Sequence, residues 1–298
     1  MERAIRRLTI LAALSSIISA GIGVFYTNGG VARTVQNLYG QTVTLYGDGV
    51  YANNSLLKVG ATKGADVVMI LTGVILLVLV FGFMNKKWAI PLRAGLISLM
   101  LYASTCLIMG VSFNQLFPLY LVQFGCALFA FILSTRQLLS METYKKEAYD
   151  RSFKGTGIFL IVSACSVLVW LTSIVPAVLT GSMETMETLE IYTTEPTFVI
   201  DLAIIFPSAL FSGIMLLKRK KIGYQLAPIM LTLLAGVGAC VIFQTVFHTS
   251  LGIILPIGQL IGFVGSFIIL GVFATALNFK LLRYAKPNNG FGKNTGDI

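Results

Sequence analysis

Eight apolar runs of membrane-spanning length dominate this chain and leave few folds open to it. They cover residues 5–26, 65–84, 94–112, 116–133, 156–180, 198–217, 223–246 and 251–279. A helix needs about 20 apolar residues to cross the hydrocarbon core of a bilayer. Only 11% of the residues are charged, against about 25% in an ordinary soluble domain. We therefore expect an all-α integral membrane protein with eight transmembrane helices.

The Lys and Arg residues fall on one side of this eight-span pattern. Of the 22 in the chain, all but Arg33, Lys58 and Lys63 lie at the two ends or in the segments after the second, fourth and sixth runs. Because positively charged loops stay in the cytoplasm, we expect both termini there, in a multi-pass protein of the plasma membrane. A cleaved signal peptide is the alternative for the first run, and it would leave seven spans.

The two halves of the chain repeat the same order of spans and loops. The landmarks that correspond at an offset of 135 residues are Asp66 and Asp201, Lys86 and Lys221, and Asn114 and Thr249. This predicts a parallel 4+4 repeat about an axis along the membrane normal, although a chance match is the alternative because few residues are identical. The expected parts are a first half, 1–135, with an external loop at 27–63, a basic cytoplasmic linker, 136–155, a second half, 156–280, and a cytoplasmic tail, 281–298.

The external loop between the first two spans contains the pattern of a β-hairpin. Asp48 and Gly49 form a dipeptide that suits a tight turn, and residues 43–46 and 50–52 on either side are rich in Val and Tyr. We expect a small external hairpin over residues 43–52. It serves either as a lid on a site or as a structural cap.

Two carboxylates fall near the outer ends of spans. An acid inside a bilayer is costly unless it faces a cavity or a partner, so Asp66 and Asp201 are candidate functional residues. At 100° per residue, Asp201 shares one helix face with Thr197, Ser208 and Ser212. Asp66 has an alternative interpretation, as an acid that stabilises a helix N-terminus.

Further polar residues lie near the same membrane face. They are Gln244 and His248, four residues apart on one helix face, together with Gln123 and Glu195. With Asp66, Asp201, Thr197 and Ser208 they form the predicted ligand-binding site, which faces outward. The chain has one His, and metal sites use several ligands at defined spacing, so we predict neither a metal site nor a cofactor.

Two charged segments outside the spans each allow two interpretations. The second outer loop carries Glu184, Glu187, Glu190 and Glu195, which either form a solvated face or raise the local cation concentration. The basic linker is either solvated or bound to anionic lipid headgroups at the cytoplasmic face. The expected partners are the lipid bilayer and a small solute or ion, with no nucleic acid. The oligomeric state stays open.

Three classes of function fit these features. The chain has no P-loop, no His-Glu-x-x-His, no Gly-x-Ser-x-Gly and no Cys-x-x-Cys, so the familiar hydrolytic and redox chemistries lack their residues. We favour binding or transport of a small solute or ion through Asp201 and Asp66. The alternatives are a regulatory or scaffolding subunit that contacts a partner through its external loops, and a membrane-embedded enzyme that uses the Asp pair.

Short motifs resemble those of a bacterial family of eight-span integral membrane proteins. They are the run at 45–51, followed by Ser55, Gly60, Gly64 and Asp66, then residues 114–117 and 200–202. The resemblance extends over most of the chain and implies an eight-span architecture. Since no activity is attached to that family, it implies no catalytic residue.

Overall fold

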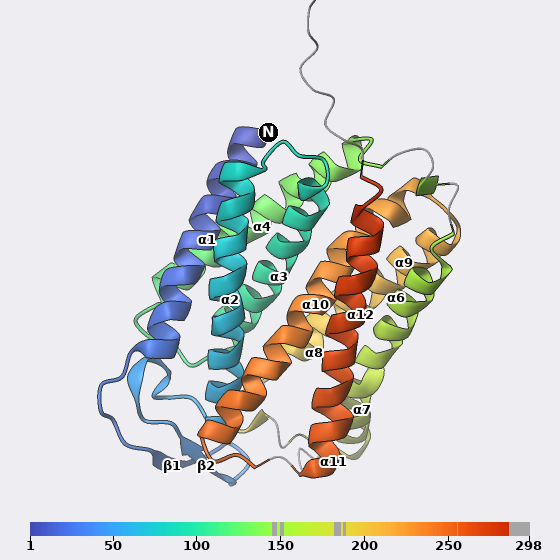
Figure 1. Ribbon diagram of the computed structural model, residues 1–298. Helices are drawn as coiled ribbons and strands as arrows, with labels where there is room; N and C mark the ends of the chain where they lie inside the picture. Colours follow the sequence, from blue (N-terminus) through green and yellow to red (C-terminus); the bar gives the residue numbers. More distant parts are fainter. Residues whose placement is uncertain (145–147, 150–151, 182–185, 187–188, 255, 286–298) are drawn as a thin grey trace, which may run out of the picture.

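The helices run side by side along the molecule (Figure 1). The computed structural model describes residues 1–144, 148–149, 152–181, 186, 189–254 and 256–285. Within these residues, eight helical segments are long and apolar enough to span a membrane, as expected. They are α1 (Glu2–Phe25), α2 (Leu56–Gly82), α3 (Ala89–Gly110), α4 (Phe117–Ser140), α6 with α7 (Lys154–Ser166, Leu171–Thr180), α8 with α9 (Pro196–Ile200, Phe206–Leu217), α10 (Lys221–Ser250), and the π-helical stretch Leu260–Val264 with α12 (Gly265–Leu282). The short helix α11 (Ile257–Gln259) precedes the last span.

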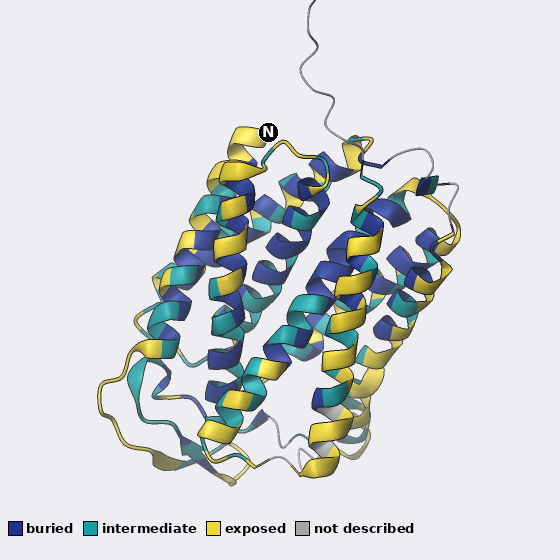
Figure 2. Cartoon of the chain, viewed as in Figure 1, coloured by how far each residue is buried: buried dark blue, intermediate teal, exposed yellow. Residues whose placement is uncertain are grey.

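The outward faces of the helices are exposed (Figure 2), and many of the residues on them are large and apolar. On α2, for example, Val78 and Phe81 are 53% and 64% exposed, whereas Leu76 and Val80 are buried between helices. Exposed apolar surface on this scale marks a membrane or partner interface. The burial pattern therefore agrees with a multi-pass membrane protein.

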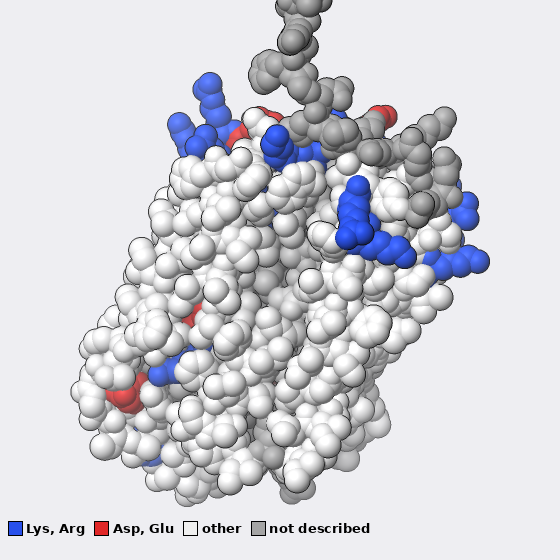
Figure 3. All heavy atoms as spheres, viewed as in Figure 1, with Lys and Arg blue, Asp and Glu red and all other residues white. Residues whose placement is uncertain are grey.

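Basic side chains are distributed unevenly along the molecule. Lys and Arg gather at the end that carries the N-terminus, where the turn between α2 and α3 also lies (Figures 1 and 3). One predicted member of this basic set is placed differently. Arg93 is fully buried in α3, where Nη1 donates to the Met84 carbonyl at 3.0 Å and Nη2 donates to Gln137 Oε1 at 3.0 Å.

Helix α10 joins the two groups of helices. It packs against α2 and α3 of the first half and against α9 and α12 of the second. Gly64 allows this approach, because a Cβ atom at that position would overlap the backbone of Gln244. Helix α10 therefore packs the two halves against each other. The 4+4 repeat stays a prediction from the sequence pattern.

A small hairpin lies between α1 and α2, as predicted, but the prediction of its residues, 43–52, is wrong. The strands are β1 (Arg33–Gln36) and β2 (Thr42–Leu45), paired antiparallel. Residues 50–52, expected to be the second strand, instead belong to a short 3₁₀ turn, Gly49–Tyr51, and its end. Asp48 explains the difference, because Oδ1 accepts from the backbone N–H groups of Asn28, Gly29 and Gly49. These bonds, the one from Asn28 foremost, lower the pKa of Asp48 below its ordinary value and fix a turn that ends the strand.

The external loop is shorter than expected. Helix α2 begins at Leu56 rather than at residue 65, because Ser55 caps it by accepting from the Lys58 N–H at 3.2 Å. Hydropathy alone missed these first turns, which contain Lys58 and Lys63. Ser55 is a typical N-cap residue, so the sequence did contain an indication that the helix begins here.

The linker between the halves is partly packed into the fold. Helix α4 continues to Ser140, and Tyr144 and Phe153 are buried. Their rings lie 6.5 and 5.8 Å from the ring of Tyr224 on α10. The interpretation as a fully solvated linker is therefore wrong for these residues. Lys145, Lys146 and Arg151 lie outside the described residues, as does the tail from residue 286.

Candidate functional site

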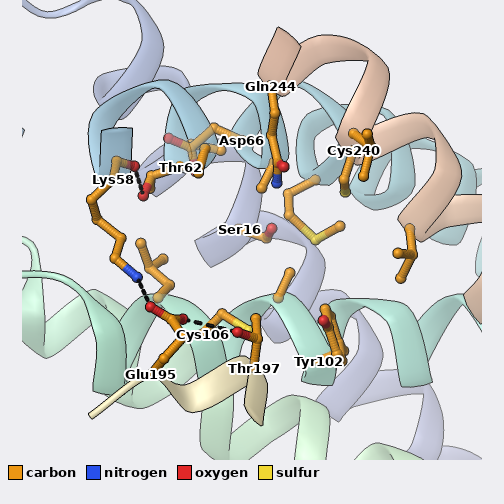
Figure 4. A pocket seen from close by; sticks show the side chains of 18 of the residues that line it. Ser16, Lys58, Thr62, Asp66, Tyr102, Cys106, Glu195, Thr197, Cys240 and Gln244 are labelled. Carbon is orange, nitrogen blue, oxygen red and sulfur yellow. Dashed lines mark hydrogen bonds and ion pairs between the residues drawn. The ribbon is translucent and has the colours of Figure 1, made fainter. Parts of the chain in front are cut away.

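A cavity of about 210 Å³ lies between the helices of the two halves (Figure 4). Its walls come from α1, α2, α3, α4, α8, α10 and α12, the 3₁₀ turn Val167–Trp170 and the π-helical stretch Asp201–Ile205. Of the eight predicted site residues, the cavity brings six together, which are Asp66, Gln123, Glu195, Thr197, Asp201 and Gln244. Both candidate aspartates thus face the same space.

Asp66 is held by a residue of the outer loop. The Tyr51 hydroxyl donates to Asp66 Oδ2 at 2.8 Å, and both side chains are buried. Burial, reinforced by the negative charge of Asp66, raises the pKa of Tyr51 above its ordinary value and keeps the hydroxyl a donor. Gly23 on α1 makes room for the pair, because a Cβ there would overlap both Asp66 Oδ2 and the Tyr51 hydroxyl.

Asp201 is held from within the second half. Trp170, at the end of the 3₁₀ turn Val167–Trp170, donates from Nε1 to Asp201 Oδ2 at 2.9 Å. Tyr102 on α3 lines the same cavity. Each aspartate therefore receives a hydrogen bond from a neutral aromatic side chain, Tyr51 for Asp66 and Trp170 for Asp201.

The predicted polar stripe around Asp201 is interrupted. Thr197 and Asp201 line the cavity, but Ser208 and Ser212 line a separate cavity of about 330 Å³. The cause is the π-helical stretch Asp201–Ile205, in which the Phe206 N–H bonds the Asp201 carbonyl five residues back. The extra residue in this turn rotates the rest of the helix by about 100°. Ser208 is therefore not part of the site.

An ion pair connects the two halves along one side of the cavity. Lys58 Nζ in the first turn of α2 lies 2.6 Å from Glu195 Oε2, at the start of α8. Thr197 donates to the other oxygen of Glu195 at 3.1 Å (Figure 4). The two charged side chains are 15% and 13% exposed, so the pair is largely withdrawn from solvent.

The two outer loops also meet close to this ion pair. Ser55 donates to Glu190, and the Tyr192 hydroxyl donates to Asn54 Oδ1 at 2.9 Å. Asn37 donates from its side chain to the Glu190 carbonyl at 2.7 Å. Glu190 and Glu195 are thus engaged in contacts rather than solvated, while Glu184 and Glu187 lie outside the described residues.

Neutral polar groups line the rest of the cavity. Gln123 is buried, accepts from Ser19 at 2.9 Å and donates to Ser104 at 2.9 Å. Ser16 is also fully buried, but its hydroxyl has no hydrogen-bond partner among the described residues. Gln244 lines the cavity from α10.

His248 is placed away from the cavity. Its Nε2 lies 2.9 Å from the Leu57 carbonyl, which can only accept, so Nε2 carries the proton. The imidazole ring packs over Gly60, where a Cβ would overlap it. His248 therefore joins α10 to α2 and is not a member of the candidate site.

The sequence missed several residues that line the cavity. Trp170 and Tyr102 are far from Asp201 in the chain, so no local pattern connects them. Ser16 and Ser19 belong to a group of small polar residues on α1. This group could have indicated that α1 has a buried polar face. Cys106 and Cys240 also line the cavity.

Comparison of the chain with protein-family models, with curated proteins and with solved structures found no match in any of the three. The arguments about its function therefore start from the geometry of the cavity.

Proposed function

We propose that the protein binds a small solute or ion in this cavity and carries it across the membrane. One observation supports this above the others: Asp66 from the first half and Asp201 from the second line a single cavity. A site formed between two groups of helices changes its shape when the groups move relative to each other, which transport requires. Acids inside a membrane protein mark such pathways.

The site opens to the outside in this proposal. The basic end of the molecule lies in the cytoplasm of a plasma-membrane protein, with both termini, as the positive-inside rule predicts. Its Lys and Arg side chains meet anionic lipid headgroups there. The hairpin and the loop contacts of Ser55 and Glu190 then lie on the outer face, beside Lys58 and Glu195 of the cavity.

A parallel repeat gives the site its two similar sides. Helix α2 ends at Gly82 and α9 ends at Leu217, so Asp66 and Asp201 each precede the end of their helix by the same number of residues. This agreement supports the 4+4 repeat. The halves differ locally, because α2 is a continuous α-helix and its counterpart contains the π-helical stretch.

Thermal stability of the purified protein tests the binding function. Ligand at 100 times its dissociation constant stabilises a protein by about 2.7 kcal/mol. The protein is heated with a panel of inorganic ions, amines, organic acids, sugars and neutral metabolites, in parallel with the Asp201→Asn variant. We expect at least one compound to raise the melting temperature of the original protein and not that of the variant.

Asp48→Asn is the matched control, because it removes one negative charge outside the cavity and keeps the oxygen that accepts from Asn28, Gly29 and Gly49. It should respond like the original protein. If no compound shifts the melting temperature of the folded protein, the binding function is wrong, and a scaffolding role through the outer loops becomes the better account.

A further inference from the structure

The cavity contains more negative than positive groups. Among the described residues that line it, the acids are Asp66, Asp201 and Glu195, and the one basic side chain is Lys58. Lys58 is paired with Glu195 at 2.6 Å, and within the described residues neither aspartate lies within ion-pair distance of a basic side chain. Neither aspartate therefore has an ion-pair partner among these residues, and Lys63, one turn before Asp66 on α2, acts on Asp66 only from beyond ion-pair distance.

Carboxylates in such surroundings need a positive partner or a proton. Removing an ionised acid from water costs many kcal/mol unless charge or hydrogen bonds replace the water. Tyr51 and Trp170 donate to the two acids but carry no charge. A ligand that brings positive charge meets this requirement while both acids stay ionised.

The walls suit an organic molecule better than a bare metal ion. Met69, Leu107, Val237 and Phe267 supply apolar surface, and Tyr102 and Trp170 add two further aromatic rings. Aromatic faces attract organic cations. The cavity volume, about 210 Å³, exceeds the roughly 150 Å³ of an engineered cavity that holds benzene. Among the residues the structure describes, no three Cys, His, Asp or Glu side chains are grouped to hold a metal ion.

A separate feature points to a ligand with polar hydrogens. Ser16 faces the cavity from α1, it is 0% exposed, and its hydroxyl oxygen has no partner within the described part of the chain. Buried polar atoms in native proteins almost always have a partner. A ligand N–H group provides one for this oxygen.

We propose that the cavity takes a small organic ammonium compound, whose positive charge is balanced by Asp66 and Asp201 and whose N–H groups bond the carboxylates and Ser16. The aromatic and apolar walls then contact its hydrocarbon part. This inference rests on the proposed binding function and names its ligand class.

Trp170 provides a direct measurement of binding. The chain has two Trp residues, and Trp88, in the turn before α3, lies outside the cavity lining. In a Trp88→Phe protein, all tryptophan fluorescence therefore reports the residue that bonds Asp201. The probes are n-butylammonium, 1,4-diammoniobutane and tetramethylammonium chlorides, compared with 1-butanol, sodium butanoate and sodium chloride at equal ionic strength.

We expect at least one ammonium probe to change Trp170 fluorescence in a saturable way, with 1-butanol and butanoate binding at least tenfold more weakly. Asp66→Asn and Asp201→Asn should each weaken binding about thirtyfold or more, since an unpaired buried charge is strongly unfavourable. Asp48→Asn should bind like the starting protein. Asp66→Asn keeps an oxygen to accept from Tyr51, so its fold should be retained.

Each other outcome overturns the inference. If none of the ammonium probes binds, or if they bind equally well to both Asn variants, the ligand class is wrong. If a neutral or anionic compound from the wider panel binds instead and Asp201→Asn abolishes its binding, the binding function stands and only the ligand class fails. If nothing in the panel binds, both proposals fail together.

Discussion

At the scale of single residues, the site depends on small side chains that leave room for hydrogen bonds. Gly23 faces Tyr51 and Asp66, whereas Gly21 on the same helix has no atom near the position of a Cβ. Asp66 and Asp201 could be identified from the sequence because acids are rare inside spans. Their donors Tyr51 and Trp170 could not be identified in this way, because each lies in a different segment from the aspartate that it bonds and no sequence pattern links the two.

Replacement of Gly23 by Ala should disturb the pair directly. The added methyl group overlaps Asp66 Oδ2 and the Tyr51 hydroxyl, and such overpacking costs about 1 to 3 kcal/mol. Gly21→Ala should instead be neutral or stabilise by up to about 1 kcal/mol, because Ala favours helices. Unfolding in mixed detergent micelles measures both. Equal stability of the two variants would contradict the placement of Gly23.

Glu190 should make stability depend on pH. Burial raises the pKa of Glu190 above its ordinary value of 4.5, Ser55 and Lys58 oppose the rise, and Glu195 adds to it. The folded protein therefore holds this proton more tightly than the unfolded chain. The stabilising contribution is complete below pH 4.5 and is lost as the pH rises through the raised pKa.

The measurement is the melting temperature between about pH 4 and pH 8 for the original protein and for Glu190→Gln, which does not titrate. We expect the melting temperature of the original protein to fall relative to that of Glu190→Gln as the pH rises. A constant difference would show that Glu190 has the same pKa in the folded and unfolded chains.

At the scale of elements, one irregular helix decides which polar residues meet. The 100° periodicity predicts Thr197, Asp201 and Ser208 on one face, but the π-helical stretch places Ser208 in another cavity. Pro207 follows that stretch, and its ring excludes the ordinary α-helical contact with the carbonyl four residues before it. The hairpin also differs from its prediction for a local reason. Asp48 accepts hydrogen bonds from backbone N–H groups, and these bonds replace the expected tight turn between two strands.

Deletion of Ala203 tests the role of the π-helical stretch. Removing one residue allows a continuous α-helix, which rotates Asp201 by about 100° relative to α9. We expect normal membrane insertion, loss of solute binding and loss of the Trp170 to Asp201 bond, which tryptophan fluorescence detects. The Ala203→Leu variant keeps the helix length and should bind normally. Unchanged binding after the deletion would contradict the account.

The ion pair between α2 and α8 should couple the two halves energetically. In a double-mutant cycle with Lys58→Met and Glu195→Gln, we expect an interaction energy of about 1 to 3 kcal/mol, between the values typical of exposed and buried pairs. Lys63→Met with Glu195→Gln is the matched control, because Lys63 contacts Tyr46 instead. A coupling near zero in the first cycle would show that the pair does not hold the halves together.

At the scale of the whole molecule, the site belongs to neither half alone. The eight spans could be predicted because each run of apolar residues is long enough to cross a bilayer. The cavity could not, because it depends on how α10 packs against α2 and on contacts between loops that the hydropathy pattern does not show. The loops of the two halves meet through Ser55 and Glu190, and the helices meet around Asp66 and Asp201.

The central claim is that Asp66 and Asp201 face one cavity that opens to the outside. Its most direct test is thiol labelling of the Asp66→Cys and Asp201→Cys variants in intact cells, after the four native Cys residues have been replaced by Ala. We predict that a small membrane-impermeant thiol reagent added outside labels both variants, and that a bound solute protects both. Labelling of either variant only after the membrane is permeabilised, or protection of one without the other, would contradict the account.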